Sequence, residues 1–309
     1  MANETNEYWR QRELRHIQEN IRNDEQIARR LRQLHLRAMD NIESEIEAFY
    51  GRYATFEGIT MEEARKRVTR LDIERYERKA RRYVREFDFT EIANEEMRLY
   101  NVTMRINRLQ LLKANIHLEL LAMTSEEQRI LYEVMTESAR AEYERLSGIL
   151  GQTLTYNEQM LATIVNASFL SATWSDRLWD NQDALRHELD RLLNRGIVQG
   201  LNPRQLAREL REKFESSIYN SERLLRTELA RVQQDVFQDS ARQADINDYE
   251  FIAEPDACPV CAALDGKIFS LDEAEIGVNA FPIHPNCRCG SSLYIDRETF
   301  ERDLEARGL

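Results

Sequence analysis

The chain has 309 residues, of which 32% are charged, with a formal net charge of -12 at pH 7 and a mean hydropathy of -0.63. No run of about 18 apolar residues occurs, so the sequence predicts no membrane-spanning helix and no membrane partner. The first residues, MANETNEYWRQREL, lack the apolar core of a signal peptide, so we expect a protein made in a reducing cytoplasm.

The charge is unevenly distributed along the chain. The last 62 residues, from Asp248 onward, hold 13 acidic and five basic side chains, and with them most of the net charge. Phosphate binding needs Lys and Arg on the contacting face, so this acidic part is a poor candidate for a DNA-binding finger. The first 247 residues are mixed in sign, which leaves room there for a local basic face.

The first 200 residues favour helix. All five prolines lie at or after position 203, only Gly51 and Gly58 precede position 148, and the segment is rich in Glu, Arg, Leu and Ala. Between residues 21 and 50 the apolar residues recur every three or four positions, which predicts one amphipathic helix. We expect a loop at residues 51–58 to follow it.

Two capping boxes predict the next helix starts. Thr60 with Glu63 is expected to open a helix that runs to about residue 84. Thr124 with Glu127 is expected to open another, which ends at the glycines of positions 148 and 151. The letters FDFT, residues 87–90, break the helical pattern between them.

Helices continue to about residue 244. Residues 157–179 form the most apolar stretch and predict a buried helix, and a further helix is expected over residues 182–200. Asn202 is a good N-cap, with Pro203 at the first helical position and Gln205 at the capping-box place. A long helix from about residue 221 completes this part.

The last part of the chain changes character. YEFIAE alternates and is β-prone, Asp265-Gly266 is a turn signal, SSLYI predicts another strand, and ETFERDLEARGL predicts a short helix. We therefore predict a mainly α fold in which an elongated helical N-terminal region precedes a small α+β module with a Cys/His knuckle. The expected domains are residues 1–150 and residues 151–309.

All four cysteines lie within 32 residues, as Cys258-x2-Cys261 and Cys287-x-Cys289, and His284 lies three positions before Cys287. In a reducing compartment, clustered cysteines are more often metal ligands than disulfides. Tetrahedral zinc takes four Cys or His ligands, and a site closed by four protein ligands is structural because it leaves no position for water. We predict a structural zinc site, with two disulfides or four unligated thiols as the alternatives.

Two ligand sets compete for this zinc. A C-x2-C pair wraps one turn around a metal, and His284-x2-Cys287 has the same spacing, whereas the C-x-C pair is too tight for that geometry. One set consists of Cys258, Cys261, Cys287 and Cys289. The other keeps Cys258 and Cys261 and adds His284 with either Cys287 or Cys289. The sequence does not choose between them.

The sequence supplies no convincing catalytic set. A dithiol redox motif needs a βαβ context, and a zinc deaminase pairs C-x-x-C with H-x-E, whereas here His187 and Glu188 are adjacent. The four histidines outside the cysteine segment lie among charged helical residues, where we expect them to be solvated. We therefore predict a protein that is not an enzyme, with no catalytic residues.

Three elements in the last third of the chain form a set. They are LLRTELARVQQD (residues 224–235), CPVCAALDGKIF (residues 258–269) and FPIHPNCRC (residues 281–289). They are similar to the Arg-Thr-Glu helix, the C-x2-C-x3-D-G-x3-F pattern and the P-x-H-P-N-C-R-C ending of one family. By these motifs the chain resembles the minor head proteins of tailed phages, the SPP1 gp7-like or Mu F-like head morphogenesis proteins. The resemblance covers about residues 180–295.

The resemblance implies a virion structural protein that associates with the portal protein during procapsid assembly, stays inside the head and affects genome packaging or delivery. Capsid or scaffold proteins and the packaged DNA are further partners that it implies. We expect Arg226 and Glu228 to clamp their helix onto the cysteine module, with pairs Glu222–Arg226 and Glu228–Arg231 along the helix. The alternative function is a non-specific DNA-binding protein inside the phage head, whose helical body contacts phosphates.

Overall fold

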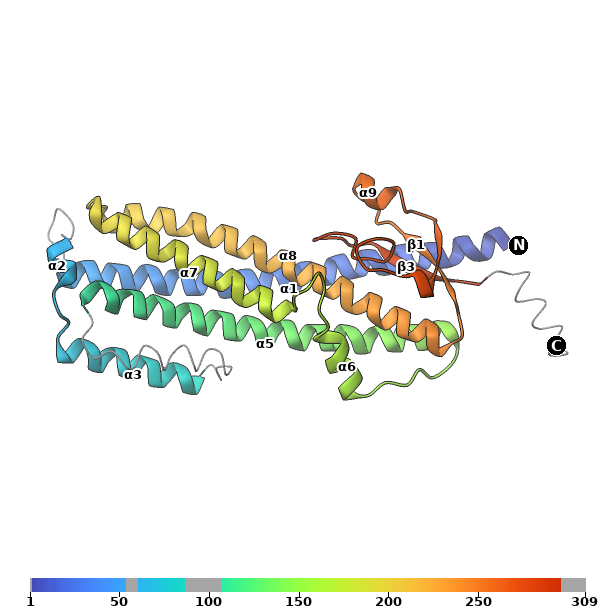
Figure 1. Cartoon of the computed structure of the whole chain (residues 1–309), viewed down its shortest axis with the longest axis horizontal. Coiled ribbons are helices and arrows are strands. Elements are labelled where there is room, and N and C mark those ends of the chain that lie inside the picture. Colours follow the sequence, from blue (N-terminus) through green and yellow to red (C-terminus); the bar gives the residue numbers. More distant parts are fainter. Residues whose placement is uncertain (1, 54–60, 87–106, 296–309) are drawn as a thin grey trace. The chain divides into compact units, whose positions relative to one another are not determined.

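The computed structural model describes residues 2–53, 61–86 and 107–295. These residues are mainly helical, as Figure 1 shows, and the predicted fold class with its small α+β module is confirmed. The longest helices are α1 (Ala2–Tyr53), α5 (Arg108–Leu150) and α8 (Pro203–Gln243). The shorter ones are α2 (Met61–Arg65), α3 (Arg70–Glu86), α6 (Glu158–Val165), α7 (Trp174–Val198) and α9 (Pro259–Ala262), with a 3-10 turn at Leu271–Glu273.

Several expectations fall outside the described residues. The loop predicted at residues 51–58 begins too early, because α1 continues to Tyr53, and its remainder lies outside the described residues. Thr60, the FDFT break and the short C-terminal helix lie outside them as well. None of the described helices combines the length and the apolar character that a membrane crossing requires.

The described residues form two compact units. Unit 1 comprises residues 1–28, 131–174 and 222–309, and unit 2 comprises residues 29–130 and 175–221. Each unit therefore gathers stretches that are far apart in the sequence.

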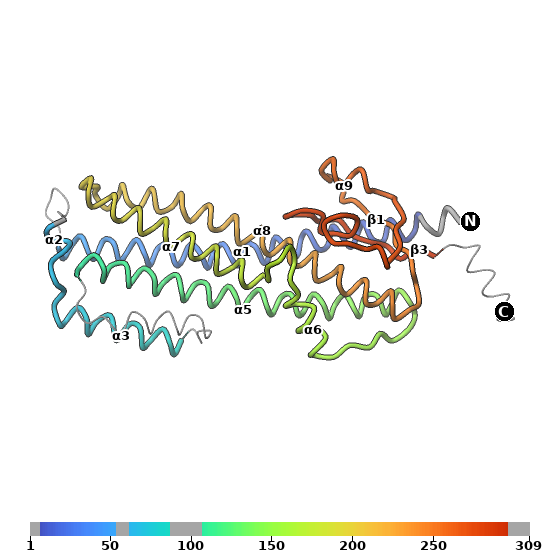
Figure 2. Tube along the Cα trace, viewed as in Figure 1, coloured from blue at the N-terminus to red at the C-terminus, as the bar shows by residue number. Residues whose placement is uncertain are grey.

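Unit 2 is a helical unit with an apolar interior. The amphipathic helix predicted over residues 21–50 is confirmed within α1, where Leu31, Ile42 and Ile46 are buried. The helix α3 lies beside α5 in both Figure 1 and Figure 2. A cluster of buried side chains, among them Tyr76 and Tyr83 of α3, packs α3 onto α5.

The helix predicted to follow residue 60 is two helices. The break after Arg65 ends α2, and α3 begins at Arg70 because Thr69 and Asp72 cap it. The Asp72 N–H donates to Thr69 Oγ1 at 3.3 Å, while the Thr69 N–H and hydroxyl donate to Asp72 Oδ2 at 3.2 and 2.7 Å. This T-x-x-D box is the start signal that the prediction missed.

The predicted helix start at Thr124 is wrong, because α5 runs through it. Thr124 and Glu127 are buried in the middle of the helix. The Glu127 carboxylate accepts a hydrogen bond from the His35 ring at 2.8 Å and another from the Ser221 hydroxyl. The Glu127 carboxylate thus serves these tertiary hydrogen bonds and does not cap a helix start. The Thr124-x-x-Glu127 pattern therefore resembles a capping box without being one. His35 and His117 are 2% and 5% exposed, so neither is the solvated histidine that the sequence suggested.

The segment after residue 156 also differs from the prediction. It forms α6 and the start of α7, separated by a loop at residues 166–173, so the single buried helix was wrong. The start of α8 was right: Asn202 and Gln205 exchange N–H to side-chain oxygen hydrogen bonds, both 3.1 Å long. However, α8 continues without interruption to Gln243 rather than beginning anew near residue 221.

A three-stranded antiparallel sheet completes unit 1. It consists of β1 (Asp248–Ile252), β2 (Ile268–Ser270) and β3 (Gly290–Tyr294), in the order β2-β1-β3. The predicted strands around residues 249–254 and 291–295 are thereby confirmed. The alternating pattern of β1 buries Tyr249 and Phe251, and the Tyr249 ring packs edge-on against Phe237 of α8 at 6.3 Å. The sheet therefore sits on α8 and carries the cysteine loops between its strands.

Candidate metal centre

The first cysteine pair lies on one short helical turn. Cys258 is the N-cap of α9 with extended backbone angles, and Pro259 occupies the first turn. Proline fits there because its fixed φ suits a helix and the N–H it lacks would have no helical partner. The Ala262 N–H donates to the Cys258 carbonyl at 2.9 Å, which closes the turn and leaves Cys261 1% exposed.

The second candidate pair, His284 and Cys287, lies on a tight turn. The Cys287 N–H donates to the His284 carbonyl at 3.0 Å, and Asn286 has a φ of 66 degrees. Proline at the second position and a residue that tolerates positive φ at the third are the requirements of a type II turn. The letters H-P-N-C therefore specify the turn that brings these two side chains together.

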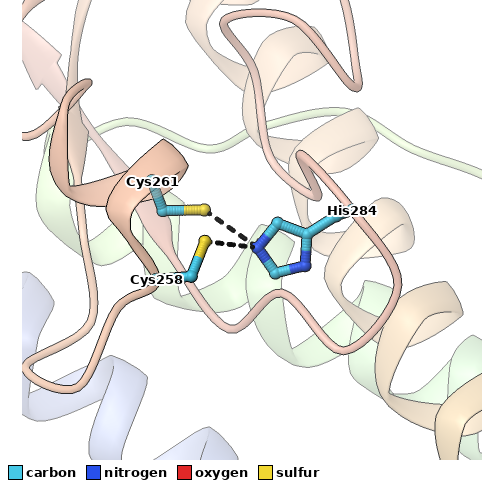
Figure 3. A group of neighbouring side chains, drawn as sticks. All are labelled: Cys258, Cys261 and His284. Atoms are coloured by element: carbon cyan, nitrogen blue, oxygen red, sulfur yellow. Dashed lines mark hydrogen bonds between the residues drawn. The ribbon is translucent and has the colours of Figure 1, made fainter.

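The two turns bring the candidate donor atoms into two groups that share Cys261. The Sγ atoms of Cys258 and Cys261 lie 3.1 and 3.2 Å from Nε2 of His284, as Figure 3 shows. The Sγ atoms of Cys261 and Cys287 are 3.8 Å apart. Two sulfurs that bind one tetrahedral zinc at about 2.3 Å are themselves about 3.8 Å apart. The donor types and these three distances thus suit zinc, while Cys287 is not grouped with Cys258 and His284.

Cys261 connects two groups of candidate ligands. It groups with Cys258 and His284 on one side, and with Cys287 and Cys289 on the other. All four cysteines carry free thiols, so the structure contains neither of the alternative disulfides. All five predicted metal-site residues therefore belong to these two groups, and His284 contacts both sulfurs of the first pair.

A carbonyl oxygen fixes the tautomer of His284. Its Nδ1 lies 2.9 Å from the carbonyl oxygen of Pro285. A carbonyl can only accept a hydrogen bond, so Nδ1 carries the proton and Nε2 turns its lone pair toward the sulfurs. Metal-binding histidines are commonly oriented by such a bond on the nitrogen that does not bind the metal.

The thiols of the cluster differ in acidity. Hydrogen bonds from the thiols of Cys261 and Cys289 lower the pKa of the Cys287 thiol, against the effect of its burial. The backbone amides of Cys261 and Val260 lower the pKa of the Cys258 thiol. The hydrogen bond to Cys287, together with burial, raises the pKa of the Cys261 thiol. Cys258 and Cys287 are therefore held closest to the thiolate form that binds metals.

The helix α8 holds the turn that carries His284 and Cys287. The Asn286 N–H donates to the hydroxyl oxygen of Thr227 at 3.1 Å, and Arg226 Nη1 donates to Asn286 Oδ1 at 3.4 Å. Arg226 also pairs with Glu222 at 3.2 Å, which confirms that predicted pair. Arg226 thus touches the candidate metal loop, together with Thr227, which the sequence reasoning did not assign.

Glu228 belongs to a different network. It forms the predicted pair with Arg231 at 2.6 Å, and Arg231 also donates to the carbonyl oxygens of Ile164 and Val165 at 2.8 and 2.9 Å. This network ties α8 to the end of α6. Arg226 and Glu228 therefore do not form one cluster, and a joint role as a clamp stays a prediction.

A small cavity of about 30 Å3, with both polar and apolar walls, lies in unit 1 between α1, α5, α8 and the cysteine module. On one wall Arg145 pairs with Glu13 at 2.9 Å and with Glu142 at 2.6 Å. Asp24 lines the cavity as well, and burial raises its pKa to about 7, against the opposing effect of Arg288 and Arg226. No sequence signal pointed to this cavity, because its walls come from four separate stretches of chain.

The arrangement of the site agrees with one comparison. No curated protein and no solved structure is significantly similar to the chain. The family model described as phage Mu protein F like protein matches residues 187–292, about a third of the chain, which include the cysteine cluster and the α8 residues that hold it. This part of the chain is therefore similar to a phage head morphogenesis family, which indicates a head- or capsid-related protein.

Proposed function

We propose that this protein is a minor head protein that joins the phage head through the portal protein and acts in procapsid assembly and in genome packaging or delivery. The observation that carries the proposal is the family match over residues 187–292, which covers the cysteine module together with its supporting helix. On this view the protein is made in the host cytoplasm and is then enclosed in the capsid, where capsid or scaffold proteins are its further neighbours.

The module holds a structural zinc ion in this proposal. Cys258, Cys261, His284 and Cys287 are the donors, and Cys289 stays beside them as a hydrogen-bonding thiol. The support is the 3.8 Å sulfur–sulfur distance, together with the Nε2 lone pair that faces two sulfurs. When bound, zinc supplies folding free energy to a module whose core is small.

The protein acts without catalysis in this proposal. Four protein ligands leave a zinc ion no position for water or substrate, so the proposed centre is structural. The module's role is then to present a rigid surface to a partner.

The portal contact is tested by co-expression of the full chain with the portal protein of the same phage, followed by affinity capture of the portal. We expect the wild-type chain to be retained with the portal, and Cys258→Ser to be retained less because its module is no longer rigid. Arg204→Gln, at an exposed position of α8 in unit 2, serves as the matched control and should be retained like the wild type. A wild-type chain that is neither captured nor found in purified virions would refute the proposal.

The metal is tested by elemental mass spectrometry of protein purified under reducing conditions without a chelator. We expect about one zinc per chain in the wild type and its loss in Cys258→Ser. Zinc-free wild-type protein would refute the zinc site while leaving the portal experiment to decide the head role.

A further inference from the structure

An acidic turn, residues 271–278, follows β2 in unit 1. Asp272, Glu273 and Glu275 are exposed on it, and Val278 at its end is 58% exposed. Among the described residues none pairs with these three carboxylates. The turn therefore offers three negative charges and one apolar side chain for a contact with another molecule.

Hydrogen bonds hold the acidic turn in one shape. The Glu275 N–H donates to Asn279 Oδ1 at 2.7 Å, and Asn279 Nδ2 donates to the carbonyl oxygen of Glu273 at 2.9 Å. Leu271 is 3% exposed and anchors the start of the turn, and the Tyr249 hydroxyl donates to the Asn279 carbonyl oxygen at 3.2 Å. A surface that is already ordered loses little conformational entropy when it binds.

A surface of the opposite charge lies on α3 in unit 2. Positions 75, 78, 82 and 85 are spaced by three, four and three residues, so they follow one face of the helix. All four are exposed arginines, and a fifth lies beside them at position 81. Within the described part of the chain, Arg75 and Arg78 form no ion pair. In a chain with a net charge of -12 this row is a local reversal of sign.

The arginines line a groove of about 680 Å3, called the arginine groove below. Lys79 and the five arginines are the positive residues of its lining, and Glu45 and Glu119 are the negative ones. The two carboxylates are already paired with Lys79, at 2.8 and 2.6 Å. The arginine groove therefore keeps a surplus of positive charge and fits an anionic partner.

Exposed apolar side chains beside the arginine row favour a protein as the partner. Leu71 and Val84 of α3 are 52% and 43% exposed. Position 71 lies four residues before Arg75 and continues the row, and Val84 precedes Arg85 in the chain. Protein interfaces combine apolar contacts with arginine, whereas an anion such as a phosphate has no apolar part to cover these side chains.

We propose that the acidic turn of one copy of this chain docks into the arginine groove of a second copy. The carboxylates from Asp272 to Glu275 lie on a stretch of backbone at most about 10 Å long. The row from Arg75 to Arg82 covers about 10 Å at 1.5 Å per residue, so the two charged surfaces match in length. A guanidinium group binds a carboxylate with two parallel hydrogen bonds, which gives such a contact a defined geometry.

A second copy is favoured because the chain itself supplies both charges. The acidic turn and the arginine row are exposed in a single copy, so neither satisfies the other there. Every copy carries both surfaces, and the surfaces differ, so the contact is either returned within a pair or repeated along a ring or chain of copies. The proposal concerns copies of this chain alone and does not depend on the portal contact.

The experiment measures self-association of the full chain by sedimentation velocity, over a series of protein concentrations at about 0.1 M and about 1 M salt. The Debye length falls from about 10 Å to about 3 Å between these two conditions. We expect the wild type to associate at the lower salt concentration and to associate at least about tenfold more weakly at the higher one, because exposed charges carry the contact.

Two charge reversals test the two surfaces. The variants are Arg75→Glu/Arg78→Glu in the arginine groove and Asp272→Lys/Glu273→Lys on the acidic turn. Each alone brings like charges together, so we expect self-association to weaken by at least about tenfold. An equal mixture of the two variants should associate again, and so should a chain that carries all four substitutions, because opposite charges then meet. This rescue distinguishes a direct contact from a folding defect.

The matched control is Arg204→Glu/Arg208→Glu, which reverses two exposed arginines of α8 in unit 2 and should leave self-association within about twofold of the wild type. A wild-type chain that stays monomeric at low salt would overturn the proposal. An equal loss in the control, or a mixture of the two reversal variants that does not associate, would overturn it as well. A monomeric wild type whose arginine groove captures polyglutamate would assign the groove to an acidic segment of another protein instead.

Discussion

Arg231 Nε lies 2.6 Å from Glu228 Oε2, and the two side chains are only 1% and 2% exposed. Arg231 also contacts Asp235 at 2.7 Å and two carbonyl oxygens at the end of α6. A guanidinium group taken out of water must regain its hydrogen bonds inside the protein, and here it does so with four partners. The pair therefore fixes how α6 meets α8.

Removal of the arginine from this network should be costly. We expect Arg231→Met to lower the free energy of unfolding by about 3–5 kcal/mol, because Glu228 then remains as a buried charge without its partner. Glu228→Gln should cost less, since Arg231 keeps Asp235 and two carbonyl partners. Urea unfolding of both variants measures this, and an Arg231→Met variant that loses less than Glu228→Gln would contradict the account.

Asp24 should make the protein less stable as the pH rises. Its pKa is about 7 in the folded state and near 3.8 when unfolded, so ionisation is harder in the folded protein. Stability should fall between about pH 4 and pH 7, and Asp24→Asn should reduce that slope, leaving the smaller contribution of Asp235, whose pKa burial raises to about 6. We expect the variant to gain about 2–4 kcal/mol at pH 8 and nothing at pH 4.

The control for this prediction is Glu19→Gln, a change at an exposed carboxylate of the same helix. It should leave the pH dependence of the urea midpoint almost unchanged. A gain for Asp24→Asn that is the same at pH 4 and pH 8 would show that the carboxylate does not titrate in this range.

Gly196 of α7 should not tolerate a methyl group. A Cβ atom there would overlap the side chain of Leu206, which is fully buried. We expect Gly196→Ala to destabilise unit 2 by about 1–3 kcal/mol, despite the better helix propensity of alanine. Gly148 of α5 has open space at the same point, so Gly148→Ala should be neutral or stabilising. Thermal unfolding of the two variants compares them, and equal effects would rule out the steric explanation.

Single serine substitutions should identify the metal ligands. We expect Cys287→Ser to lose the zinc ion and Cys289→Ser to retain it, because Cys287 is the thiol 3.8 Å from Cys261. Zinc content is measured for each variant, alongside the wild type. The reverse result would select Cys289 in place of Cys287, and a loss in both together with retention in His284→Ala would select the four-cysteine set.

Local signals in the sequence predicted local structure well. The predicted start of α8 at Asn202 is confirmed, and the turn at His284–Cys287, which was not predicted, also follows from local residues, Pro285 and Asn286. The start predicted at Thr124 failed because a partner 92 residues away, His35, takes the Glu127 carboxylate. Local patterns do not encode such distant partners.

The discontinuous units also lay beyond sequence reasoning. Arg10 pairs with Glu250 at 2.9 Å and with Asp265 at 2.5 Å, across some 240 residues. Periodicity shows that the first helix has an apolar side but does not say which later stretch covers it. The composition likewise indicated a possible basic face without indicating that it would lie on α3.

The same pairing of Arg10 with Glu250 and Asp265 has a consequence for biosynthesis. Unit 1 takes stretches from the beginning, the middle and the end of the chain, so the contact of its first helix with the sheet forms only after the sheet has been translated. Contacts of such long sequence separation form slowly, and apolar surface stays open in the meantime. The part of the first helix that faces the sheet would therefore stay uncovered for most of synthesis, and fragments cut near residue 247 would expose surfaces that the intact protein buries.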